Sequence, residues 1–189
     1  IPDELPAEEA GPFMCAGVTV YNALRNSGAR SGDVVAVQGI GGLGHLGVQY
    51  ARRMGFKTVA LGRGKDKEPL AEKLGAHQYI DSNVADTVAE LQKLGGARVI
   101  LATAPSAKAI SAVIDGLGVN GNLLVPAAPM EPLSVNALSL IMGRRSVSGC
   151  YSGTARDSQD TLEFSAFNDV HPMIEKYPLS RVGDAYEQM

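Results

Sequence analysis

The sequence predicts a doubly wound α/β fold: one parallel sheet with helices on both faces. Segments with the composition of strands alternate with segments of helical periodicity, and a glycine-rich turn joins the first such strand to a helix. The length of 189 residues fits one domain. We therefore expect a single sheet of about six strands in the order 3-2-1-4-5-6, joined by right-handed crossovers.

The glycine-rich turn follows a buried apolar strand at 34–37 and precedes a helix with one apolar side. Its residues Gly39-Ile40-Gly41-Gly42-Leu43-Gly44 fit the pattern G-x-G-x-x-G. We expect Gly39 to permit the tight turn, Gly41 to let the backbone approach a pyrophosphate, and Gly44 to let the helix pack closely. The helix N-terminus offers N–H groups to phosphate oxygens. These features predict a Rossmann dinucleotide site, with a glycine turn of another α/β protein as the alternative.

The other elements are predicted from hydrophobic periodicity and from the residues that end each segment. The segment 1–12 carries three prolines and is expected to lie outside the core, with Pro12 opening an apolar helix over 13–26 that ends at Gly28. Further strands are expected at 57–61, 78–80, 98–102, 122–125 and 146–150. Further helices are expected at 67–74, 84–94, 107–117, 135–142, 158–166 and 181–189.

Composition and charge argue against several classes of protein. The net charge is −3 and no long basic run occurs, so neither nucleic acid nor an anionic membrane surface is an expected partner. No apolar stretch approaches the length of a membrane span, and no signal-peptide pattern opens the chain. The two cysteines form no disulfide framework, so the cytoplasm is the expected location.

The loop after the second strand bears on the choice of nucleotide. A carboxylate at this strand tip would bind ribose hydroxyls and select NAD, whereas an arginine accommodates the 2′-phosphate of NADP. The strand instead ends in Leu61-Gly62-Arg63-Gly64-Lys65. Arg63 can donate two hydrogen bonds to a phosphate, and Lys65 and Lys67 add positive charge. The sequence predicts NADP as cofactor, with NAD possible and a solvated basic loop as the alternative.

Four segments resemble a known family. They are CAGVTVY at 15–21, GIGGLGHLGVQYA at 39–51, AEKLGA at 71–76 and GTARD at 153–157. They resemble the coenzyme-binding domain of zinc-dependent alcohol dehydrogenases, in the medium-chain dehydrogenase/reductase superfamily. The segment 153–157 departs from that family's usual Gly-Thr-Arg-x-Asp by one inserted or shifted residue. The resemblance implies hydride transfer between NADP(H) and a small alcohol or aldehyde, assisted by zinc in the intact enzyme.

The resemblance also implies a second domain. Such enzymes place a barrel-like catalytic domain before the coenzyme domain, and it supplies the remaining zinc ligands. Residues 1–189 are therefore expected to be the NAD(P)-binding Rossmann domain of a larger two-domain enzyme, inactive alone. A dimer or tetramer is expected because the family pairs these domains through the sixth strand.

The candidate site residues follow from the motifs and from the resemblance. Cys15 is expected to be a zinc ligand in the intact enzyme and not to bind zinc alone, because a catalytic zinc needs about three protein ligands. No other catalytic residue is expected in this chain. The expected cofactor contacts are Thr19, Gly39, Gly41, Gly42, Leu43, Gly44, Gly62, Arg63, Lys67, Thr103, Ala128, Cys150 and Ser152. Thr19 and Leu43 would face the nicotinamide and Thr103 the adenine. Ala128, Cys150 and Ser152 would lie near the carboxamide. The alternatives are a buried structural cysteine for Cys15, an ordinary helix-packing threonine for Thr19 and an inert core thiol for Cys150.

Other functions remain open or are disfavoured. A zinc-free quinone or enone reductase of the same superfamily has no use for a thiolate at Cys15. A non-enzymatic NADP-binding module fits a chain without an acid, base or metal site. A short-chain dehydrogenase is disfavoured because Tyr-x-x-x-Lys does not occur. A methyltransferase would prefer an acidic residue at the second strand tip.

Overall fold

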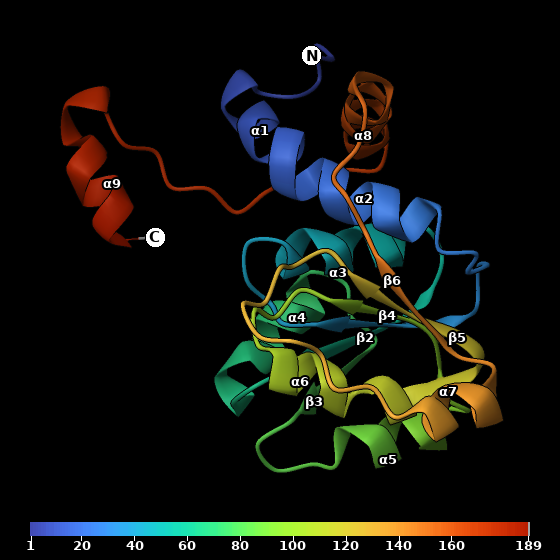
Figure 1. Cartoon of the computed structure of the whole chain (residues 1–189). Coiled ribbons are helices and arrows are strands. Elements are labelled where there is room, and N and C mark those ends of the chain that lie inside the picture. Colours follow the sequence, from blue (N-terminus) through green and yellow to red (C-terminus); the bar gives the residue numbers. More distant parts are fainter. Residues whose placement is uncertain (189) are drawn as a thin grey trace.

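Six strands form one sheet in the order β3-β2-β1-β4-β5-β6 in the computed structural model, which describes residues 1–188 (Figure 1). They are β1 Val34–Gln38, β2 Lys57–Gly62, β3 Gln78–Asp81, β4 Ala97–Ala102, β5 Leu117–Val125 and β6 Ser146–Gly149. Every neighbouring pair is parallel. The predicted fold class and strand order are therefore confirmed. The central strands are buried on both faces, which explains their continuous apolar runs.

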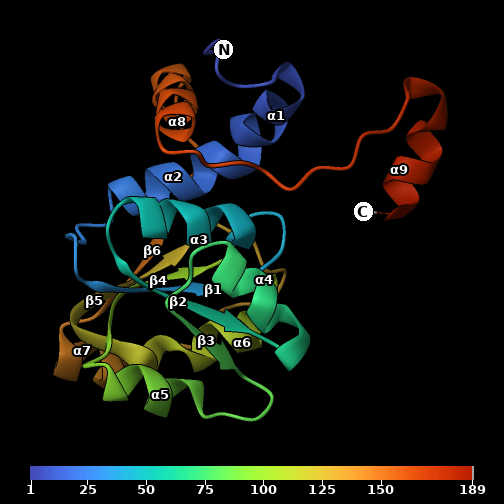
Figure 2. The same ribbon diagram turned by 180° about the vertical axis from the view of Figure 1, so that it is seen from behind.

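Helices cover both faces of this sheet (Figures 1 and 2). They are α1 Ala7–Pro12, α2 Val18–Arg25, α3 Gly44–Arg53, α4 Glu68–Lys73, α5 Thr87–Lys93, α6 Ala107–Ala112, α7 Ala137–Gly143, α8 Ala155–Phe167 and α9 Val182–Gln188. One core cluster joins α2, α3, α4 and α8 to the sheet, and a second joins α5, α6 and α7 to its other face. No helix within residues 1–188 is long and apolar enough to cross a membrane.

The first helical segment begins earlier than the sequence predicts. It starts at Ala7, after Pro6, and continues through the π-helical turn Phe13–Gly17 into α2. Pro12 lies at the end of α1, so the prediction that it opens the helix was wrong. A proline inside a helix lacks the N–H of the ladder and crowds the preceding turn. The wider π turn directly after Pro12 accommodates that defect.

The predicted helix at 107–117 is also too long. Helix α6 ends at Ala112, a 3₁₀ turn covers Ile114–Gly116, and Leu117 is the first residue of β5. The side chain of Leu117 is fully buried in the second core cluster. Its apolar character belongs to a strand that starts five residues before the predicted 122–125. The remaining elements agree with prediction apart from their ends, and the last residue of the predicted helix 181–189 lies outside the described residues.

The chain after α8 leaves the body of the domain. The segment 169–178 runs in extended form past α1 and α3, and α9 then stands away from the sheet (Figures 1 and 2). Large apolar side chains of this end are exposed, including Leu179 at 88% and Tyr186 at 74%. The segment 169–178 is held by hydrogen bonds of His171 to Glu9 in α1 and to Gln49 in α3, and of Met173 to His45 in α3. No side chain of α9 within residues 1–188 belongs to either core cluster.

Candidate cofactor site

A cavity of about 730 Å³ opens at the carboxyl end of the sheet. It lies where the strand order reverses, because the turn after β1 and the loop after β4 both line it. Ligands of doubly wound sheets bind at this position. The loops after β2 and β3 complete the wall.

The glycine turn combines three different constraints. Gly39 has φ +89° and donates its N–H to the carbonyl oxygen of Leu61 at 2.8 Å. A Cβ on Gly44 would lie 2.7 Å from the carbonyl carbon of Gly39 and would overlap its oxygen. A Cβ on Gly41 or Gly42 would meet no protein atom within 4 Å. The fold therefore explains Gly39 and Gly44, while the open space over Gly41 fits a phosphate group at the backbone.

Thr103 fixes this turn from the neighbouring strand. Its Oγ1 donates to the carbonyl oxygens of Gln38 and Gly39, at 2.8 and 3.2 Å. The cavity wall on this side is formed by the next three residues, Ala104, Pro105 and Ser106. Thr103 itself therefore positions the glycine turn, and the loop that follows it faces the cavity.

The loop after β2 presents two cations to the cavity. Arg63 and Lys67 are exposed, line the cavity, and form no ion pair with any residue in 1–188. Tyr79 lies against Gly62, where a Cβ would fall 2.8 Å from its ring. The same tyrosine donates its hydroxyl to the carbonyl oxygen of Gly64 at 2.7 Å. The loop is thus braced from β3 while its cations stay accessible.

Asp81, the last residue of β3, holds this loop through its carboxylate. Its Oδ1 accepts the N–H groups of Gly64 and Asn83 at 2.8 and 2.9 Å. Sequence reasoning missed Asp81, and it also missed several residues of the cavity wall. These are Gln38, Ser82, Asn83, Asp86 and Lys108. Gln38 ends β1, and Ser82 and Asn83 directly follow β3, so their position at the carboxyl end of a strand could have identified these three.

The residues predicted to lie around the nicotinamide are not part of this cavity wall. Thr19 is buried on α2 and donates its hydroxyl to the carbonyl oxygen of Cys15 at 2.7 Å. Leu43 precedes α3 and packs partly against the core, and Ala128 is exposed in the loop after β5. Cys150 is half-buried, and burial raises the pKa of its thiol. Ser152 is joined to α2 by its carbonyl oxygen, which accepts from Asn22 at 3.2 Å.

Cys15 lies in the π-helical turn with its side chain exposed. Among residues 1–188, no group of three or more His, Cys, Asp or Glu side chains is arranged to hold a metal ion. Cys15 therefore offers a single donor, and about three protein donors are needed for a catalytic zinc. The described part of the chain alone does not fit that metal.

His45 connects the glycine turn to the segment 169–178. Its Nδ1 lies 3.0 Å from the carbonyl oxygen of Gly41, and its Nε2 lies 3.0 Å from the backbone nitrogen of Met173. A neutral ring protonated at Nδ1 satisfies both contacts. Burial lowers the pKa of His45, which favours this neutral form.

His171 has the opposite electrostatics on the same segment. Its ring nitrogens lie 2.6 Å from a carboxylate oxygen of Glu9 and 3.0 Å from one of Asp169. These two carboxylates raise the pKa of His171. The charged form of His171 and the neutral form of His45 therefore both hold this segment in place.

The stability of the fold should depend on pH through these two histidines. Because the folded-state pKa of His45 is lowered, its contribution is present above its unfolded pKa of about 6.5 and is lost as the pH falls. Because the folded-state pKa of His171 is raised, its contribution is present below about 6.5 and is lost as the pH rises through the folded value. We expect His45→Asn to flatten the acid side of the stability profile and His171→Gln the alkaline side. Urea unfolding from pH 5 to 8 measures both slopes, and profiles parallel to the wild type would contradict the assignment.

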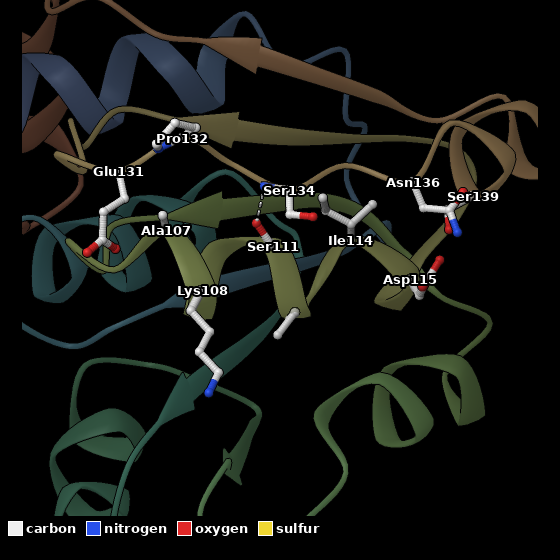
Figure 3. A pocket seen from close by; sticks show the side chains of 11 residues that line it. Ala107, Lys108, Ser111, Ile114, Asp115, Glu131, Pro132, Ser134, Asn136 and Ser139 are labelled. Atoms are coloured by element: carbon white, nitrogen blue, oxygen red, sulfur yellow. Dashed lines mark hydrogen bonds between the residues drawn. The ribbon is translucent and has the colours of Figure 1, made fainter.

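A second cavity, of about 510 Å³, lies on the other side of α6 (Figure 3). Its walls are joined by a hydrogen bond from the Ser134 N–H to the Ser111 hydroxyl, at 3.0 Å. Lys108 lines both cavities. This second cavity lacks the glycine turn and the Arg63 cation of the first, so the first remains the candidate cofactor site.

The chain matches known proteins along its whole length. The family model described as zinc-binding dehydrogenase matches residues 42–167. The alcohol dehydrogenase patD of Penicillium expansum is 44% identical over 189 residues, which cover 100% of this chain and 55% of that protein. An alcohol dehydrogenase of Geobacillus stearothermophilus is 36% identical over 190 residues, covering 100% of this chain and 56% of its own length. The chain therefore spans about half the length of these curated relatives.

Solved structures agree with these relatives. The alcohol dehydrogenase of Aeropyrum pernix superposes with a TM-score of 0.88 at 26% identity, covering 100% of this chain and 57% of that one. A cinnamyl alcohol dehydrogenase of Sorghum bicolor gives a TM-score of 0.87 at 28% identity, with 100% and 53% covered. Because the family model covers most of the chain and the fold agrees, the chain belongs to the zinc-binding dehydrogenase family and has the fold of the coenzyme-binding domain of its alcohol dehydrogenases.

Proposed function

We propose that this chain binds NADP(H) as the coenzyme domain of an alcohol dehydrogenase or aldehyde reductase. The observation that carries the proposal is the open space over Gly41, in the turn whose residues Gly39 and Ile40 line the cavity at the strand-order reversal. The N–H groups at the start of α3 would bind the pyrophosphate there. The cavity beside them is large enough for the adenosine half of the cofactor.

The preference for NADP over NAD is supported by charge at the tip of β2. Arg63 and Lys67 line the cavity without ion pairs among residues 1–188, so a phosphate can use both. The nearby Asp81 of β3 directs its Oδ1 to two backbone N–H groups, those of Gly64 and Asn83. A 2′-phosphate would therefore meet two cations at this position.

The activity of the whole protein is proposed from its relatives. Several are named alcohol dehydrogenases, and a Bacillus subtilis relative that is 36% identical is named a probable formaldehyde dehydrogenase. The nicotinamide would supply hydride chemistry. Thr19, Leu43, Ala128, Cys150 and Ser152 would position its ring and carboxamide. Cys15 would add one thiolate to a zinc site completed by a second domain of the intact enzyme, and residues 1–189 would form its coenzyme domain.

A homo-oligomer is also proposed. Helix α7 packs on β5, the neighbour of the edge strand β6, and its side chains Leu138, Ile141 and Met142 are 61, 70 and 76% exposed. Apolar surface next to an open sheet edge favours pairing of two copies. Sedimentation equilibrium of the chain tests this, and a monomer at all concentrations would contradict it.

Arg63→Ala is expected to weaken NADPH binding by about tenfold to a hundredfold, because a charged hydrogen-bonding partner of the 2′-phosphate is lost. NADH has no 2′-phosphate, so its affinity should change by less than about twofold. Parallel titrations of both nucleotides, followed by cofactor fluorescence, measure the two effects.

Arg30→Ala provides the matched control for this experiment. Arg30 is exposed, lies ahead of β1 at the opposite end of the sheet, and makes no side-chain ion pair within residues 1–188. Its removal should leave both affinities unchanged. Wild-type binding of NADH as tight as that of NADPH would overturn the choice of NADP, and binding of neither would overturn the cofactor role of this chain.

A further inference from the structure

Gln38 brings a buried, unused acceptor to the wall of the cofactor cavity. It is the last residue of β1, is among the residues that line the cavity, and is 8% exposed. Its Nε2 donates to the carbonyl oxygen of Ala109 in α6 at 2.8 Å. Its Oε1 is buried and has no hydrogen-bond partner among residues 1–188. Buried acceptors are nearly always paired, so this oxygen indicates a missing donor.

The orientation of the amide follows from its neighbour. If the oxygen and nitrogen of the Gln38 amide were exchanged, Oε1 would face the carbonyl oxygen of Ala109, and two acceptors would oppose each other. The amide nitrogen therefore faces α6. Oε1 is left as the atom that lacks a donor among residues 1–188.

The surroundings of Gln38 suit a flat, largely apolar group. On the α6 side the cavity is lined by Ala109, Ala112 and Val113, and on the other side by Leu61 and Val88. The cations lie in the loop after β2, beyond the end of that strand. A nucleotide with its phosphate at these cations would place its base on the α6 side, next to Gln38.

We infer that Gln38 Oε1 accepts a hydrogen bond from the exocyclic amino group of the adenine, which makes Gln38 a specificity-determining residue for the base. The inference rests on the proposed nucleotide-binding function and adds the recognition of the base to it. A ribose hydroxyl is the other donor in adenosine. It is expected beside Gly62 and Arg63, at the strand tip that binds the ribose in this fold.

The test compares two ligands that differ at the inferred contact and at the neighbouring N1, which carries a hydrogen in hypoxanthine. NADPH and its hypoxanthine analogue, in which an oxo group replaces the amino group, are titrated against the full chain and against Gln38→Met. The wild type should bind NADPH about threefold to tenfold more tightly than the analogue, the range expected of one neutral hydrogen bond. In Gln38→Met, which keeps the length of the side chain, the ratio should fall to about one. A general loss of affinity would weaken both ligands equally and leave the ratio unchanged.

Gln92→Met is the matched control, because Gln92 also donates its amide to backbone carbonyls but lies outside the cavity. In Gln92→Met, the ratio of the affinities for NADPH and the hypoxanthine analogue should equal that of the wild type. Gln38→Asn, which withdraws the oxygen by one methylene, should lower the ratio as well and serves if the methionine variant does not fold.

The inference is overturned by an unchanged ratio in both Gln38 variants. A second comparison uses a cofactor that lacks the adenosine 3′-hydroxyl. If the wild type binds this cofactor more weakly than NADPH and the Gln38 variants bind the two equally, the donor is the ribose and the inference is overturned. Failure of the wild type to bind any dinucleotide would overturn the proposed function, and this inference with it.

Discussion

Gly44→Ala is expected to lower the free energy of unfolding by about 3 kcal/mol, because the added methyl group overpacks the contact between α3 and the glycine turn. The new Cβ would overlap the carbonyl oxygen of Gly39 and lie 3.1 Å from the hydroxyl of Thr103. The peptide of Gly39 cannot move aside easily. Its N–H is bound to Leu61 at 2.8 Å, and its oxygen accepts from Thr103 at 3.2 Å. Helix α3 would therefore have to shift away from β1.

Urea unfolding of Gly44→Ala and Gly42→Ala measures this effect against a close control. A Cβ on Gly42 meets no protein atom within 4 Å, and its φ lies outside the left-handed region. Gly42→Ala should therefore stay within about 0.5 kcal/mol of the wild type. Equal stability of the two variants would show that close packing at Gly44 does not matter.

Gly41→Ala is expected to weaken NADPH binding by about tenfold to a hundredfold while leaving the stability of the free protein unchanged. The methyl group would meet no protein atom, so the fold has no reason to respond. It would occupy the space that a pyrophosphate needs at the backbone, and one extra carbon in a fitted site costs a factor of this size. Cofactor titration and thermal unfolding, done on the same preparation, separate the two effects.

Gly11→Ala is the control for that pair of measurements. Gly11 lies in α1, outside the cavity, and a Cβ there also meets no protein atom within 4 Å. It should leave NADPH affinity unchanged. Unaltered NADPH affinity in Gly41→Ala would mean that the phosphates lie elsewhere, and a large loss of stability would mean that Gly41 has a structural role.

Local sequence was sufficient for the architecture. The apolar runs of β1, β2 and β4 have no polar alternation because both faces of these strands are buried. Alternation of such strands with helices, together with right-handed crossovers, leaves few possible strand orders. The predicted order is the one observed.

Element ends were less predictable because they depend on packing. The apolar residues Val113, Ile114 and Leu117 would suit a longer helix α6, but Leu117 is buried in the strand β5. Pro12 is compatible with the first turn of a helix, yet the chain enters a helix at Ala7 and absorbs the proline in a π turn. Periodicity reports which residues are apolar and does not report which element buries them.

The sequence by itself determined the glycine turn and the basic loop after β2, because each depends on residues adjacent in the chain. It also determined the strand order, because alternating strands and helices leave few arrangements. Only the tertiary structure decided which distant groups meet at the site. Asp81 accepts from Gly64 across 17 residues and Gln38 binds Ala109 across 71. His45 accepts from Met173 across 128. Each of these contacts joins groups from separate elements, and their meeting depends on how the sheet and its helices pack. That packing leaves the Arg63 cation without an ion pair and the Gln38 oxygen without a donor among the described residues, and neither property is visible in the sequence.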